Sequence, residues 1–175
     1  MTARRDPGRQ HEKVGLVGEV RRRFHAELRA LEGEVQRTGT QAQRLLEQAL
    51  QALTRRDLAV CEAVISGDDE VDELYLDVER RILGLFALQT PVASDLRLLT
   101  ALLHINLHLE RIADQAVNMA KITKLAHGLP QSPKVLQHLE EMGALALGVG
   151  TFVGCPVRRR GRGLPGPSWW APVRR

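Results

Sequence analysis

The chain has few aromatic residues, few cysteines and no proline between Pro7 and Pro91. Aromatic side chains make up 3% of its 175 residues, so the core has to be built from Leu, Val, Ile and Ala. This set favours helices over β-sandwiches, whose strands are rich in β-branched and aromatic side chains. Two cysteines are too few for a disulfide framework. Cys61 lies in the apolar segment LAVCEAVI, which predicts a core position for its thiol.

Long apolar segments are also missing. A helix that spans a bilayer needs about 18 to 20 predominantly apolar residues in a row, and the chain has no such run. Its first residues, MTARRDPGRQHEK, contain no apolar stretch of the kind found in secretory signals. We therefore expect a cytoplasmic protein with no membrane insertion.

The positive charge is concentrated at the C-terminal end. The formal net charge is +4, but residues 150–175 carry six Arg and no acidic residue, which leaves −2 for the first 149 residues. A mildly acidic body argues against a nucleic-acid partner. The tail has two interpretations, a disordered basic arm or a gene read out of frame after Val149. A nucleic-acid-binding function would require a genuine tail.

The proline-free span has room for two long helices. In the first, core positions recur at alternating steps of four and three residues, a heptad pattern typical of supercoiled helices. The residues of this stripe are Phe24, Leu28, Leu31, Val35, Thr38, Ala42, Leu45, Ala49 and Ala52. Asp57 is a suitable N-cap for the second helix, which is predicted to continue through Gly67 and Gly84 to about Leu88.

The positions of later prolines predict two more helices. Thr90-Pro91 and Ser132-Pro133 each combine an N-cap residue with a first-turn proline. The third helix is predicted to end near Leu125 and the fourth near Val149. The apolar arc of the third helix is expected to comprise Leu102, Ile105, Leu109, Ile112 and Ala116.

These segments predict an all-α fold in which three long antiparallel helices form an up-down-up bundle, followed by a partial fourth helix and a disordered tail. We expect a flexible N-terminus at residues 1–18 and a three-helix repeat at 19–126. A second repeat is expected to begin at 131–149. Residues 150–175 are expected to form an aberrant or disordered basic tail.

Two pairs of carboxylates are the candidates for a binding site. Asp68 and Asp72 on the second helix, and Glu110 and Asp114 on the third, are each four residues apart, so the members of a pair are neighbours on one helix face. Both pairs border apolar stripes, where uncompensated acids cost free energy. One interpretation is an exposed acidic turn paired with Arg. The other is a cation site whose oxygen ligands suit iron, manganese, magnesium or calcium.

Other motifs of enzymes and metal proteins are absent. The chain has no glycine-rich phosphate loop, no CxxC, no HExxH and no nucleophile elbow, so we expect no catalysis. It also lacks the Glu-x-x-His motif of di-iron bundles. His104 and His108 have a zinc-like spacing but fall on the polar arc, which predicts solvated side chains. Asp95 is explained by its place near a helix N-terminus.

Three segments, in this order and spacing, resemble the PhoU family. They are Asp68-Asp69-x-Val71-Asp72, Gln89-x-Pro91-Val92-Ala93-x-Asp95-Leu96-Arg97 and Leu109-Glu110-Arg111-Ile112-Ala113-Asp114 with Asn118 following. The resemblance implies repeats of three-helix bundles in a cytoplasmic, often dimeric protein without catalytic activity. It implies a negative regulator of phosphate uptake and of the phosphate-starvation response, an adaptor between the ATPase of a phosphate ABC transporter and a sensor histidine kinase. It also implies that Asp68, Asp72, Glu110 and Asp114 bind iron or another divalent metal.

The resemblance covers Arg21 to Val149 and departs from the family pattern after that point. The segment SPKVLQHLEEMGALALGV resembles the opening helix of a second repeat, and the Arg/Gly/Pro tail stands where the rest of that repeat is expected. Two alternatives follow, a metal-binding bundle without a signalling role and a non-functional truncated family member. The fourth helix is expected to expose an apolar stripe that favours homodimers or lowers solubility. The stripe comprises Val135, Leu136, Leu139 and Met142.

Overall fold

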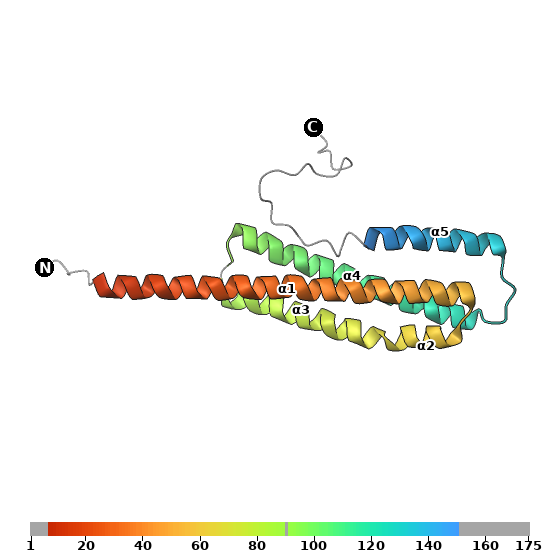
Figure 1. Ribbon diagram of the computed structural model, residues 1–175. Coiled ribbons are helices and arrows are strands. Elements are labelled where there is room, and N and C mark those ends of the chain that lie inside the picture. The colour runs from red at the N-terminus through yellow and green to blue at the C-terminus, as the bar shows by residue number, and fades with distance from the viewer. Residues whose placement is uncertain (1–6, 90, 151–175) are drawn as a thin grey trace, which may run out of the picture.

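A computed structural model describes residues 7–89 and 91–150 of the chain. This part contains five helices and no strand. The helices are α1 (Pro7–Arg55), α2 (Leu58–Ser66), α3 (Asp68–Leu88), α4 (Ala93–Leu125) and α5 (Pro133–Gly150). Figure 1 shows that α1 and α4 run in one direction while α2 and α3 return beside them, so the predicted all-α, up-down-up bundle is confirmed. None of the described helices is long and apolar enough to cross a membrane.

The long helix α1 is organised by its heptad stripe. All nine residues predicted to form the stripe are buried. The polar member, Thr38, is fully buried and donates its hydroxyl to the carbonyl of Glu34 at 3.1 Å. This hydrogen bond within the helix satisfies the hydroxyl, which explains how a polar residue fits into an apolar seam.

Helix α1 begins at Pro7, inside the segment 1–18 that was predicted to be a flexible terminus. A proline is well tolerated in the first helical turn, and no later proline interrupts the helix. At 1.5 Å per residue, its 49 residues span about 74 Å. The helix therefore extends beyond the bundle at its N-terminal end (Figure 1).

The turn between α1 and α2 follows the prediction. Asp57 caps α2, and its Oδ1 accepts hydrogen bonds from the amides of Ala59 at 2.9 Å and Val60 at 3.2 Å. The preceding residue, Arg56, has a positive φ of 54°.

The prediction of one continuous second helix is wrong at Gly67. Helix α2 ends at Ser66, and the amide of Gly67 donates to the carbonyls of both Ala63 and Val64 at the end of that helix. A Cβ at Gly67 would lie 2.9 Å from Cδ2 of Leu45, so the glycine permits a close approach to α1. The φ of −79° keeps this residue in the right-handed region, and α3 continues in roughly the direction of α2 (Figure 1). Gly84 does not interrupt α3, as predicted.

The third predicted helix begins two residues later than expected. Pro91 and Val92 precede α4, and the extended Val92 supplies the carbonyl that accepts from the amides of Asp95 and Leu96, each at 2.9 Å. Thr90, the predicted cap, lies outside the described residues. The predicted end at Leu125 is confirmed, and Gly128 follows with a φ of 90°.

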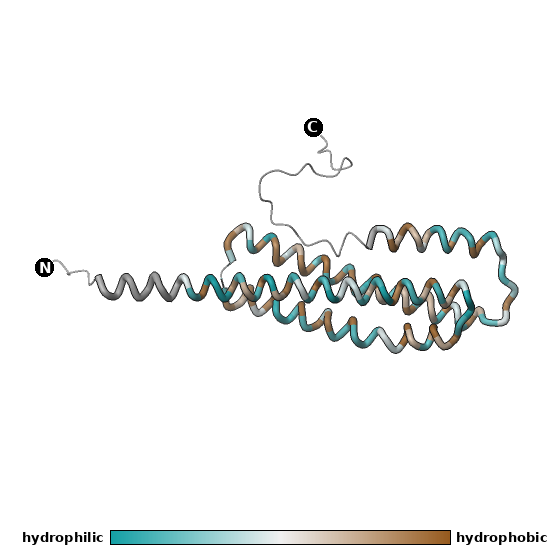
Figure 2. Tube along the Cα trace, viewed as in Figure 1, coloured by the Kyte–Doolittle hydropathy of each residue, from teal (hydrophilic) through white to brown (hydrophobic). Residues whose placement is uncertain are grey.

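Two apolar clusters fill the bundle. We call one the leucine-rich core, which comprises Phe24, Leu28, Leu31, Val35, Val78, Ile82, Leu85, Leu99, Leu102 and Leu109. The other is the alanine-rich core, which comprises Ala42, Leu45, Ala49, Ala52, Cys61, Val64, Val71, Ala113, Ala116, Val117 and Ala120. Figure 2 shows the apolar turns that recur along the bundle helices, separated by hydrophilic ones.

Helix α5 is attached to the bundle differently. Among the described helices it packs on α1 alone. The contact is close, because a methyl group at Gly143 would clash with the side chain of Leu50. Of the stripe predicted to be exposed, Val135 and Met142 are 57% and 64% exposed, whereas Leu136 and Leu139 are partly buried. The basic tail after Gly150 lies outside the described residues.

Candidate functional site

The four predicted carboxylates lie on two neighbouring helices. Asp68 and Asp72 occupy the first turns of α3, and Glu110 and Asp114 lie in the middle of α4, which packs against it. They are close enough that acids of one helix raise the pKa of acids on the other. The structure therefore brings both pairs together, and we call these four residues the carboxylate cluster.

The members of the cluster differ in exposure. Asp68 and Glu110 are partly buried, whereas Asp72 and Asp114 are exposed. Oδ1 of Asp68 is buried and has no hydrogen-bond partner. Within the described part of the chain, no residue donates a hydrogen bond to the four carboxylates or forms an ion pair with them. The Arg pairing considered for an exposed acidic turn is thus not seen at these four residues, although Asp72 and Asp114 are exposed as that interpretation requires.

Burial is the main cause that raises the pKa of Asp68 above its ordinary value. The neighbouring charges of Asp72 and Asp114 raise this pKa further, and Lys121 opposes them. An acid with no donor in contact and with like charges nearby favours its protonated form.

The pKa of Glu110, on the other helix, is also raised above its ordinary value. Burial raises its pKa most, followed by the charges of Asp114 and Asp72, while Arg111 lowers it. For these two acids on adjacent helices, nearby basic residues thus only partly offset the cost of burial and repulsion.

The donor chemistry of the cluster suits a hard divalent cation, which binds carboxylate oxygens and neutralises their charge. The unpartnered oxygen of Asp68 is a free acceptor for such an ion. In the described residues, however, no three His, Cys, Asp or Glu side chains converge closely enough to hold a metal. A metal at this site would therefore require the carboxylates to rotate toward a common point.

One buried polar residue beside the cluster was missed in the sequence. Asn106 lies one turn before Glu110 and is fully buried. Its Nδ2 donates to the carbonyl of Tyr75 at 3.0 Å, and its Oδ1 has no partner. Burial raises the pKa of the Tyr75 phenol, with further contributions from Glu79 and Glu110. A polar residue thus lies inside the bundle, between Leu102 and Leu109 of the leucine-rich core on the same helix.

Asn106 was not predicted because the wrong residues of α4 were assigned to its buried face. Ile112 is 36% exposed, so the predicted arc was wrong at this position, whereas Ile105 is partly buried against the leucine-rich core. The buried residues instead follow the same heptad steps as α1. They are Asp95, Leu99, Leu102, Asn106, Leu109, Ala113, Ala116, Ala120 and Thr123, and Val117 is the one further buried residue of the helix. Extending that spacing along the sequence would have identified Asn106.

Other candidates have the surroundings that the sequence predicts. His104 and His108 are exposed. Cys61 is fully buried, and its burial raises the pKa of the thiol. Asp95 lies in the first turn of α4 and is 9% exposed.

Fold and site together define a helical-bundle protein with a carboxylate cluster rather than a recognisable catalytic constellation. The profile of the PhoU domain matches residues 35–123, which include all four residues of the cluster. That match covers half of the chain, and the chain belongs to the PhoU family.

Similar proteins carry one description, "Phosphate-specific transport system accessory protein PhoU homolog". That of Caulobacter vibrioides is 34% identical over 125 residues, which are 71% of this chain and 54% of the relative. That of Aquifex aeolicus is 36% identical over 110 residues, 62% of this chain and 50% of the relative. "Homolog 2" of Mycobacterium tuberculosis is 33% identical over 106 residues, 60% and 50% of the two chains. The chain thus spans about half the length of these relatives.

Proposed function

We propose that this protein regulates phosphate uptake as an accessory component of a phosphate transport system. The match of the PhoU domain to the three-helix bundle carries this proposal. The names of the similar proteins support it, since each is described as an accessory protein of phosphate-specific transport. A bundle without a catalytic motif suits a protein that acts by contact with others.

In its finer form, the proposal is a negative regulator of the phosphate-starvation response. The protein would connect the ATPase of a phosphate ABC transporter to a sensor histidine kinase. It would work in the cytoplasm, as a homodimer, without turnover of a substrate and without binding nucleic acid. The mildly acidic body and the exposed apolar side chains of α5 support these expectations.

Complementation tests the regulatory role. The full chain is expressed in a bacterium that lacks its own PhoU, and alkaline phosphatase is assayed in high phosphate. We expect phosphatase to be repressed. A version completed with the second repeat of a relative is run beside it, because the chain spans only half the length of its relatives.

The two versions of the protein distinguish the alternatives. Repression by the completed version alone would identify this chain as a non-functional truncated member of the family. Phosphatase that stays high with both versions would overturn the regulatory proposal.

A second candidate function is divalent-metal binding by the carboxylate cluster, with or without a signalling role. The observation that favours it is the buried, unpartnered oxygen of Asp68, beside Asp72 and Asp114, whose charges raise the pKa values of Asp68 and Glu110. Asp68, Asp72, Glu110 and Asp114 would supply the oxygen ligands, and iron or another divalent cation would relieve their repulsion.

Metal analysis with a charge-matched control tests this site. In one variant all four residues of the cluster are changed to the corresponding amides. In the control the same change is made at four acids outside the cluster, Asp69, Glu70, Glu73 and Asp77. After exposure to Fe²⁺ or Mn²⁺ and dialysis, we expect the bound metal to be lost in the cluster variant and retained in the control. Equal metal content in both variants would refute the site.

A further inference from the structure

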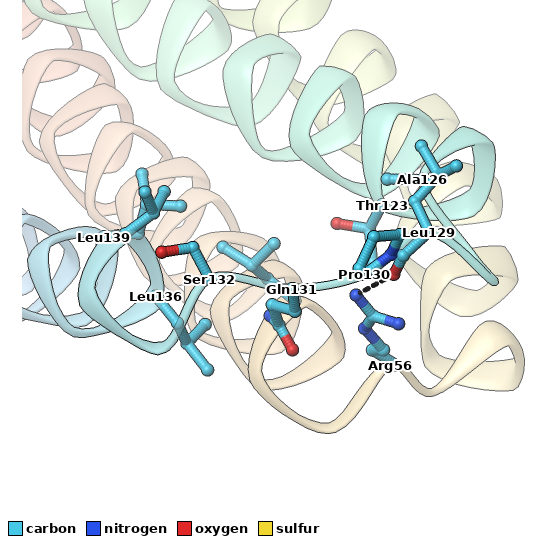
Figure 3. A pocket seen from close by; sticks show the side chains of 11 residues that line it. Arg56, Thr123, Ala126, Leu129, Pro130, Gln131, Ser132, Leu136 and Leu139 are labelled. Atoms are coloured by element: carbon cyan, nitrogen blue, oxygen red, sulfur yellow. Dashed lines mark hydrogen bonds between the residues drawn. The ribbon is translucent and has the colours of Figure 1, made fainter.

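A cavity of about 350 Å³ lies where the turn between α1 and α2 meets the linker between α4 and α5. Figure 3 shows its lining residues, which come from the end of α1, that turn, the end of α4, the linker and the first turns of α5. The volume falls in the range of pockets that bind small organic molecules. No member of the carboxylate cluster lines it, so this is a separate site.

Arg56 provides the one charged side chain among the described residues that line the cavity. Its φ of 54° is a left-handed conformation that costs free energy for a residue other than glycine. Its Nη2 donates to the carbonyl of Leu129 at 2.7 Å, so the guanidinium extends from the turn to the linker (Figure 3). A guanidinium has five N–H donors, and this contact leaves others for a further acceptor.

The remaining walls are largely apolar. Leu53 of α1 contributes on one side, and Val135, Leu136 and Leu139 contribute from α5. Leu129 is 60% exposed, so the described chain leaves apolar surface open at this cavity. Exposed apolar surface around a concave site is typical of ligand-binding grooves.

We propose that this cavity binds a small amphipathic organic anion, a carboxylate attached to an apolar chain. The carboxylate would pair with the guanidinium of Arg56, whose planar fork matches carboxylate geometry. The apolar chain would lie against Leu53, Leu136 and Leu139. Bare inorganic anions would leave these walls in contact with water, and no acidic side chain among the described lining residues suits a metal ion.

Such a ligand would affect the position of α5. Among the described helices α5 packs on α1 alone, so few contacts fix it. A molecule that touches both Arg56 and Leu136 would connect the α1–α2 turn to α5 directly. Binding would then hold α5 and the linker in one arrangement relative to the bundle.

Isothermal titration of the full chain with decanoate tests the proposal. We expect saturable binding of one decanoate per chain, and at least about tenfold weaker binding by Arg56→Gln, as for the loss of a charge-assisted hydrogen bond. The matched control is Arg55→Gln, which removes the same charge from an exposed neighbour that does not line the cavity. Decanol, which keeps the chain but lacks the charge, should bind more weakly than decanoate to the unmodified protein.

The outcomes that overturn the proposal are specific. Absence of saturable decanoate binding would do so, as would equal losses in Arg56→Gln and Arg55→Gln or equal binding of decanol. Circular dichroism and thermal melting of each variant show whether it is folded. If Arg56→Gln is unfolded, Val135→Ser, at an exposed wall position, takes its place and should weaken binding. If light scattering shows a dimer that does not bind decanoate, a second copy covers the cavity and the proposal is wrong.

Discussion

The two halves of the bundle interior are built from side chains of different size. The leucine-rich core contains six leucines and no alanine, whereas six of the eleven residues of the alanine-rich core are alanines. Large side chains bury more apolar area, and small ones let helices approach closely. Asp68, Asp72 and Asp114 flank residues of the alanine-rich core, Val71 and Ala113. One half thus buries larger side chains, while the other lies beside acids of two helices.

The largest effect is expected from truncating the leucine-rich core. Leu31→Ala removes a fully buried side chain and should lower the free energy of unfolding by about 3 kcal/mol. Ala49→Gly in the alanine-rich core is the comparison and should cost about 1 kcal/mol. Urea denaturation measures both. Equal losses would mean that the two halves do not differ in their contribution to stability.

The alanine-rich core should instead be sensitive to added volume. Ala116 is fully buried, and Ala116→Leu should lower the free energy of unfolding by about 2 kcal/mol because the tightly packed helices have to separate. Ala101→Leu makes the same change on the exposed face of α4 and should have little effect. Unchanged stability in Ala116→Leu would contradict tight packing in this half.

Within the leucine-rich half, Asn106→Leu should raise the free energy of unfolding by about 1 kcal/mol. The change removes a buried oxygen that has no partner, and apolar replacements of buried polar groups are often stabilising. Asn118→Leu, at an exposed position on the same helix, serves as the control. A loss of stability would show that the hydrogen bond to Tyr75 outweighs the unpartnered oxygen.

The smallest effect is a pH dependence of stability that arises from two acids of the carboxylate cluster. Folding raises the pKa of Asp68 and of Glu110 above their ordinary values of 3.8 and 4.5. At a pH between the ordinary and the raised pKa of each acid, the folded protein therefore binds more protons than the unfolded chain. Stability due to these acids therefore falls as pH rises through that window.

Removing the charges of Asp68 and Glu110 tests whether stability falls as the pH rises. In metal-free buffer, the combined change Asp68→Asn and Glu110→Gln should stabilise the protein at neutral pH and have less effect near pH 4, about the ordinary pKa of these acids. Thermal unfolding across this range measures the difference. The control is Asp69→Asn with Glu73→Gln, at exposed positions. A stabilisation that grows on acidification would contradict the raised pKa values.

Much of the fold could be predicted from local rules. Every residue of the heptad stripe of α1 was predicted correctly, because apolar and small residues recur at the heptad spacing along the whole segment. The start of α2 was predicted because Asp57 is a strong N-cap. The break at Gly67 could not be predicted, since its cause is the approach of Leu45 from another helix. The early start of α1 was missed because its first turns lack an apolar stripe of their own.

The candidate site was predictable in its residue types but not in its geometry. Spacing identified both acid pairs, yet only the packing of α3 on α4 places them near each other. Asn106 was overlooked because Ile105 is the more hydrophobic neighbour, although the heptad spacing selects the asparagine. The cavity at Arg56 is formed by a turn, a linker and α5, and no sequence pattern indicates that these separate segments meet.

Helix α1 crosses both apolar cores without a break and also carries α5. Its ladder of backbone hydrogen bonds continues past Thr38, so neither half of the bundle can open without disturbing the helix on which the other half packs. The divided interior therefore unfolds as one cooperative unit. In hydrogen exchange, amides in the middle of α1 should be protected by the same free energy on either side of Thr38.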